Sequence, residues 1–189
     1  MGDLPRQHTI ALCDAILVAE NKSAAGLLEH IAAVAGFRAI ESVLSPSARP
    51  ATPAKVKFFL VHHQMGDPAK AALLRSVRAS RDDDLRFSPV VLITGDCSFE
   101  DVLKYIDMGF DDVISLPEKA EVLHGRLSSQ VNADVIYIQT TNYLGPDRRR
   151  MELDLRSDRV RQGEFKHSRL TIRRDAALGT KVVGEVIFA

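Results

Sequence analysis

The sequence predicts a doubly wound α/β domain built on five parallel strands, and two patterns carry this prediction. One is a βαβ unit, in which an apolar run at 90–94 precedes a helical pattern that stops at Gly109 and a second apolar run at 113–114. Three more short apolar runs precede this unit, at 15–19, 37–43 and 58–61. Strands that alternate with helices form a sheet with helices on both faces, and ligands bind at the carboxyl ends of its strands.

The first strand (15–19) ends at Glu20-Asn21, and Ser23 is the predicted N-cap of the helix that follows. The apolar residues of this helix that share one face are Leu27, Leu28, Ile31 and Val34. The second strand (37–43) precedes three prolines, Pro46, Pro50 and Pro53. Each proline removes a backbone donor and disfavours helix in the residue before it, so we expect no crossover helix there.

The third strand (58–61) leads to a helix with Asp67 as N-cap and Pro68 as its first residue. The residues expected on its inner face are Ala71, Leu74 and Val77. The segment 81–87 is expected to be a charged loop.

The helix after the fourth strand begins with a weak capping box, in which Ser98 is the N-cap and Asp101 lies three residues on. The fifth strand ends at Leu116, and Pro117 is expected to open the last helix. The residues of that helix predicted to face the core are Val122, Leu123 and Leu127.

The composition fits a globular protein. The chain has 189 residues, of which 46% are apolar, and it fits one domain of about 130 residues with an appendage. We divide it into an N-terminal arm (1–13), a main domain (14–131) and a C-terminal extension (132–189). No apolar run approaches the roughly 20 residues of a transmembrane helix, and the N-terminus lacks the pattern of a signal peptide. Cys13 and Cys97 are not in ligand spacing, so we expect buried free thiols in a cytoplasmic protein.

Four segments in order, ILVAEN, FFLVHHQMGDP, VVLITGD and MGFDDVISLP, resemble the receiver domain of bacterial two-component response regulators. The resemblance covers roughly residues 14–131 and depends on the spacing of the strand ends and on MGFDDVISLP. It implies a flavodoxin-like sheet with the strand order 2-1-3-4-5.

The resemblance also implies a phosphorylation pocket, with an acidic pair for Mg²⁺, an Asp acceptor, a Ser or Thr hydroxyl and a Lys. The residues at these positions are Glu20 and Asn21 for the pair, His62 for the acceptor, Thr94 for the hydroxyl and Leu116 for the lysine, with Val113 at the aromatic switch position. Mg²⁺ prefers oxygen ligands, and Leu116 offers no charge to a phosphoryl group. We therefore predict a pseudo-receiver that is not an enzyme and has no metal or cofactor.

His62 and His63 leave two alternatives open, a metal site at the strand end and a phosphohistidine at His62. Neither residue has a further His or Cys at ligand spacing. The favoured interpretation is that a polar side chain fills the vacated acidic pocket.

The C-terminal extension is the basic part of a chain whose net charge is zero, because residues 147–189 hold eleven Lys or Arg and seven Asp or Glu. A short strand is expected at 135–138 and a turn at Gly145-Pro146-Asp147. An expected interaction segment follows, with the three cations Arg148, Arg149 and Arg150. A segment of this form resembles one that follows receiver domains in alphaproteobacterial proteins.

The end of the extension predicts a β-hairpin around the loop 176–179. A lone hairpin is marginal in water, so this hairpin must pack on its own domain or on a second subunit. Acidic residues interrupt the basic run, and no helix-turn-helix or zinc pattern follows, so nucleic-acid binding is not favoured.

The sequence favours one function over two alternatives. The favoured one is a phosphorylation-independent signalling adaptor that acts as a homodimer and contacts a histidine kinase, a phosphotransferase or another signalling protein, without nucleic acid or membrane. The alternatives are an atypical response regulator that is still phosphorylated and a DNA-binding regulator that uses the basic extension.

Overall fold

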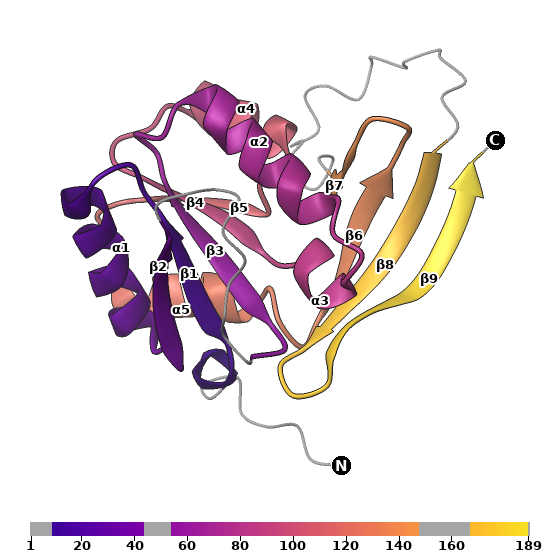
Figure 1. The fold of residues 1–189 in the computed structure, drawn as a ribbon, viewed down its shortest axis with the longest axis horizontal. Helices are drawn as coiled ribbons and strands as arrows, with labels where there is room; N and C mark the ends of the chain where they lie inside the picture. Colours follow the sequence, from indigo (N-terminus) through magenta and orange to yellow (C-terminus); the bar gives the residue numbers. More distant parts are fainter. Residues whose placement is uncertain (1–8, 44–53, 148–166, 189) are drawn as a thin grey trace.

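The computed structural model describes residues 9–43, 54–147 and 167–188, which form two sheets (Figure 1). The larger sheet is parallel, and its five strands follow the order β2-β1-β3-β4-β5. These strands are β1 (Asp14–Val18), β2 (Ala39–Val43), β3 (Lys57–His62), β4 (Val90–Thr94) and β5 (Asp112–Ser115). The predicted fold class and the strand order 2-1-3-4-5 are both confirmed.

Helices cover both faces of this sheet. They are α1 (Lys22–Ala35), α2 (Asp67–Arg78), the one-turn α3 (Asp83–Arg86), α4 (Phe99–Met108) and α5 (Ala120–Ser128), and a 3-10 helix, Ile10–Leu12, precedes β1. Leu28 of α1 and Leu123 of α5 belong to one apolar cluster, whereas Leu74 of α2 and Ile106 of α4 belong to the other. Successive residues of β1 alternate between the two clusters, which explains why such strands are continuous apolar runs in the sequence.

Three helix starts, those of α1, α2 and α5, differ from the prediction, whereas the capping box at Ser98 is confirmed. The N-cap of α2 is Gly66, so Asp67 is the first helical residue. The N-cap of α5 is Lys119, whose backbone is still extended (φ −70°, ψ 142°), so Pro117 precedes the helix instead of opening it. The segment 81–87 was expected to be a loop but contains α3, because four residues after the capping Asp82 complete one helical turn.

Three side chains predicted to face the core are exposed instead. They are Leu27, Val34 and Val122, with exposed fractions of 40%, 44% and 42%. The inner face of α1 is made in large part by alanines, Ala24, Ala32 and Ala35. Small side chains allow α1 to lie close to the sheet, and its larger residues at the margins stay in contact with solvent.

The C-terminal extension forms a four-stranded antiparallel sheet in the order β7-β6-β8-β9. Its strands are β6 (Asp134–Gln139), β7 (Leu144–Pro146), β8 (His167–Asp175) and β9 (Gly179–Phe188). The predicted hairpin is therefore present. The turn predicted at Gly145-Pro146-Asp147 is wrong, because Gly145 and Pro146 pair with β6 as part of β7.

This second sheet packs on its own chain. Phe87, which precedes β4, shares an apolar cluster with Tyr137, Leu170 and Ile172 of the extension. The rings of Phe87 and Tyr137 meet edge to face, with centroids 5.6 Å apart. The surface that the hairpin needs is thus supplied by the main domain.

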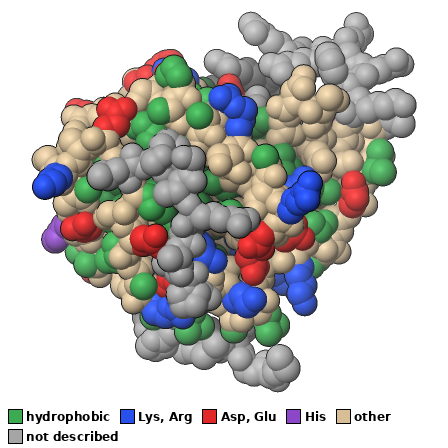
Figure 2. All heavy atoms as spheres, in the orientation of Figure 1, with side chains coloured by type: hydrophobic (Ala, Val, Ile, Leu, Met, Phe, Trp, Pro, Cys, Tyr) green, Lys and Arg blue, Asp and Glu red, His purple; other side chains and the backbone are tan. Residues whose placement is uncertain are grey.

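Two predicted features lie outside the described residues: the prolines Pro46, Pro50 and Pro53, and the cations Arg148, Arg149 and Arg150. Among the described helices, none is long and apolar enough to cross a membrane. On the face in view in Figure 2, basic and acidic side chains are interspersed over the described residues.

Candidate functional site

The candidate site is a pocket of about 520 Å³ at the carboxyl edge of the parallel sheet. His62, Thr94 and Leu116 line it, so the structure brings together three of the five predicted pocket residues. The rest of the lining is largely apolar and includes Leu27, Ile31, Val34, Ile93 and Leu123. Glu20 and Asn21 are not among the lining residues.

One carboxylate oxygen of Glu20 and the side-chain oxygen of Asn21 already accept hydrogen bonds. Asn21 is the N-cap of α1, and its side-chain oxygen accepts a hydrogen bond from the Ala24 backbone at 2.9 Å. This cap replaces the predicted Ser23. A carboxylate oxygen of Glu20 accepts a hydrogen bond from the Gly66 backbone at 3.1 Å and so connects the loops after β1 and β3. The two residues predicted as the acidic pair of a magnesium site therefore form a helix cap and a contact between loops.

His62 is the last residue of β3 and is buried. Its Nδ1 accepts a hydrogen bond from the Gln64 backbone at 3.3 Å, which places the proton of a neutral ring on Nε2. Burial, the neighbouring His63 and the ammonium of Lys70 together lower the pKa of His62 below its ordinary value of 6.5. A neutral, buried imidazole therefore occupies the predicted acceptor position.

The structure does not combine His62 and His63 into a metal site. Their rings lie 4.7 Å apart with a tilt of 47°. Within the described residues, no group of three His, Cys, Asp or Glu side chains could hold a metal ion.

The other three predicted residues belong to β4 and β5. Thr94 lies on β4, Val113 lies on β5, and Leu116 directly follows β5. Thr94 ends β4 and is buried. Leu116 packs against the apolar cluster under α1 and α5, so it contributes to packing at the position where the sequence resemblance implies a lysine. Val113 is buried in the cluster on the opposite face of the sheet, beside α4.

A polar cluster beside the pocket was not predicted from the sequence. Asp67 forms ion pairs with Lys70 at 3.1 Å and with Lys104 of α4 at 2.6 Å. The buried Lys70 also donates to the Tyr105 hydroxyl at 3.3 Å and lies 4.6 Å from the centre of that ring. These contacts connect the start of α2 to α4. The sequence identified Asp67 only as a capping residue, because Lys104, its partner on α4, is distant along the chain.

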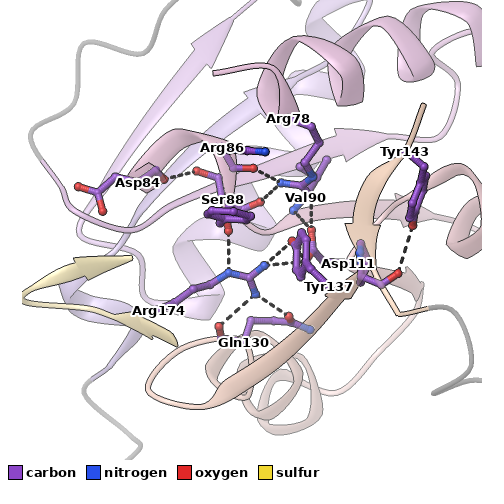
Figure 3. Close-up of polar contacts among 12 residues, drawn as sticks. Arg78, Asp84, Arg86, Ser88, Val90, Asp111, Gln130, Tyr137, Tyr143 and Arg174 are labelled. Carbon is purple, nitrogen blue, oxygen red and sulfur yellow. Dashed lines mark hydrogen bonds and ion pairs between the residues drawn. The ribbon is translucent and has the colours of Figure 1, made fainter. Parts of the chain in front are cut away.

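A second polar cluster, also missed, connects the main domain to the extension (Figure 3). The carboxylate of Asp111 is fully buried and pairs with Arg78 of α2 and Arg174 of β8, both at 2.7 Å. It also accepts hydrogen bonds from the Tyr137 hydroxyl at 2.6 Å and from the Val90 backbone at 2.8 Å.

Burial alone would raise the pKa of Asp111, but the charges of Arg174 and Arg78 outweigh burial and hold the pKa below its ordinary value. Arg174 itself has no solvent exposure and donates to the carbonyl oxygens of Phe87 and Gln130. The cluster is thus a charged link between the two sheets.

The strand order and the pocket at the carboxyl edge define a doubly wound domain of the flavodoxin-like type. No protein-family model and no curated protein matches the sequence. Among solved structures, the chain is similar to the signal receiver domain of a signal transduction histidine kinase from Syntrophus aciditrophicus, at 25% identity over 62% of this chain and 88% of that one, with a TM-score of 0.45.

Two further solved structures are similar at lower identity. The chemotaxis response regulator CheY4 of Vibrio cholerae is 17% identical over 63% of this chain and 98% of that one, with a TM-score of 0.48. The receiver domain of the sensor histidine kinase PA1611 from Pseudomonas aeruginosa, solved with a magnesium ion, is 19% identical over 62% of this chain and 94% of that one, with a TM-score of 0.46.

Proposed function

We propose that this protein is a phosphorylation-independent pseudo-receiver, which acts as a non-enzymatic adaptor in two-component or phosphorelay signalling. The observation that carries the proposal is the chemistry of the pocket, where His62 occupies the acceptor position and Leu116 the position of the cation. A neutral imidazole cannot form an acyl phosphate, and an apolar side chain cannot neutralise phosphoryl oxygens.

Magnesium binding is disfavoured by the same residues. Mg²⁺ takes oxygen ligands in a near-ideal octahedron. Of the two candidate oxygen donors, Asn21 is committed to the cap of α1 and Glu20 to the Gly66 backbone. Binding the ion through these same oxygen atoms would break both contacts.

Contacts across the helices support a constitutive state. In a switching receiver the helix after the fourth strand responds to the phosphoryl group, whereas here α4 is already connected to α2 through Asp67, Lys104 and the pair of Lys70 with Tyr105. The face formed by α4, β5 and α5 would then be presented to a partner without any modification.

In this proposal the protein acts as a homodimer in the cytoplasm. Its partner is a signalling protein such as a histidine kinase or a phosphotransferase. Nucleic acid is not part of the proposal, because charges of both signs are interspersed on the face in view in Figure 2.

The proposal is tested with beryllium fluoride, a phosphoryl analogue that requires Mg²⁺ and an acidic acceptor. We expect no change in the amide NMR spectrum of the protein when beryllium fluoride and Mg²⁺ are added together. The matched control is the triple variant Asn21→Asp, His62→Asp and Leu116→Lys, which restores the chemistry that a receiver needs and should bind the analogue. Magnesium-dependent shifts around Thr94 in the unmodified protein, or an acyl phosphate after incubation with acetyl phosphate, would overturn the proposal.

A further inference from the structure

Strand β9 is a long free edge of the second sheet. Within the described residues it pairs with β8 alone, and Figure 1 shows it at the outer margin of the molecule. The other edge of this sheet, β7, has only three residues. The free edge of a strand presents unpaired N–H and C=O groups, which another strand can satisfy.

Apolar side chains gather along this edge. Those that are substantially exposed are Val182, Val183, Val186, Ile187 and Phe188, with exposed fractions of 42%, 49%, 55%, 71% and 43%. Exposed edges are usually protected by charges or prolines. The stretch 184–188 holds a single charge, Glu185, and no proline. Apolar surface and unpaired backbone groups therefore coincide on one segment.

The pairing with β8 defines which part of β9 is regular. A register shift between Thr171 and Ile172 leaves Val183 as an extra residue, so pairing is regular on each side of it, over Gly179–Val182 and over the longer stretch Gly184–Phe188. A β-bulge of this kind also disturbs pairing along the edge of β9 that faces away from β8. The usable stretch is thus 184–188.

We infer that two copies of the protein join through this stretch, paired antiparallel about a two-fold axis at Val186. The inference rests on the homodimer of the proposed function and supplies its interface. A strand can always pair antiparallel with its own copy, and such a contact closes after two subunits.

Charge and shape favour this register. With the axis at Val186, Glu185 faces Ile187 of the second copy, whereas an axis at Glu185 would place two carboxylates opposite each other. Gly184 then faces Phe188 of the second copy. A Cβ on Gly184 would meet only Thr171, at 3.5 Å, so the space above this glycine can take an aromatic ring.

The first test is the mass in solution, measured by light scattering on the full chain at several concentrations. We expect a dimer for the unmodified protein and a monomer for Val186→Lys, which adds a charge opposite its own copy. Leu178→Lys is the matched control, because Leu178 is also apolar and exposed but lies in the turn before β9, and this variant should remain a dimer. Far-UV circular dichroism spectra that match that of the unmodified protein show that the variants fold.

The second test is cross-linking in a Cys97→Ser background, which leaves only the buried Cys13. Opposed residues of antiparallel strands have Cα atoms about 4.5–5.5 Å apart, within the range of a disulfide. Val186→Cys should therefore form a covalent dimer under mild oxidation, whereas Lys181→Cys, outside the paired stretch, should not.

The two tests separate the possible failures. A monomer at all concentrations overturns the homodimer and this interface together. A dimer that survives Val186→Lys, and in which Val186→Cys does not cross-link, overturns the β9 interface alone and leaves the homodimer on another surface. A monomeric protein whose β9 pairs with a strand of a different protein also contradicts the inference.

Discussion

At Asp111, two guanidinium groups and a phenol meet one carboxylate in a site without solvent. A buried ion pair of this kind adds little net stability when complete, but it is costly to break, because the remaining charge loses its partner. The contacts of Arg174 and Tyr137 with Asp111 therefore make the docking of the extension on the main domain specific.

The variant Arg174→Met tests this arrangement. It leaves Asp111 with one of its two cations, and we expect a loss of about 3–5 kcal/mol in the free energy of unfolding, measured by urea denaturation. The neighbouring Arg173→Met is the control, because Arg173 pairs with Asp134 at the surface and should change stability little. Equal effects of the two variants would contradict a role for the buried pair.

The protonation of His62 gives the second prediction. Because its pKa in the folded state is lowered, its contribution to stability is complete above the unfolded value of 6.5 and is lost as the pH falls through the folded pKa. An NMR titration should show this ring titrating below pH 6.5. The variant His62→Gln should reduce the loss of stability between neutral and mildly acidic pH, and a ring that titrates above 6.5 would be incompatible with a neutral, buried His62.

At the scale of elements, the start of α1 decides what Asn21 does. Its side chain satisfies the Ala24 backbone, one of the donors that an α-helix leaves unpaired at its beginning. A residue predicted to belong to a magnesium-binding acidic pair thus caps a helix.

The third prediction compares two caps. Asn21→Ala should lower the free energy of unfolding by about 1 kcal/mol, whereas Ser23→Ala should have little effect because Ser23 is already inside α1. Asn21→Asp, which retains an acceptor oxygen, should behave like the unmodified protein. Thermal or urea unfolding measures all three, and a larger effect at Ser23 would show that the cap had been wrongly assigned.

For the whole molecule, the extension completes the main domain. It covers Phe87 and supplies Arg174 and Tyr137 to Asp111. The two sheets should therefore unfold as one cooperative unit.

The fourth prediction follows from this coupling. A chain that ends after Val131 exposes Phe87 and removes two partners of Asp111, so we expect a clearly lower melting temperature and a tendency to aggregate. Differential scanning calorimetry of both chains measures the effect. A truncated chain as stable as the full one would mean that the two sheets are independent.

Much of the fold follows from local sequence patterns. The five strands of the parallel sheet, the capping box at Ser98 and the stop at Gly109 depend on residues that are neighbours along the chain, and each was predictable. The pocket positions His62, Thr94 and Leu116 were also predictable, because strand ends of a parallel sheet meet at one edge.

The tertiary structure decided what those positions and the extension do. The link from Asp111 to Arg174 joins residues 63 positions apart. A periodic pattern of apolar residues in the sequence does not predict such a contact. Likewise, the strand order leaves β9 at an edge, and packing through small side chains leaves Leu27 exposed on α1. The sequence by itself determined the elements, because hydrogen bonding and burial within an element are local. Only the three-dimensional structure decided which polar groups are paired and which surface stays open, because both depend on neighbours that are distant along the chain.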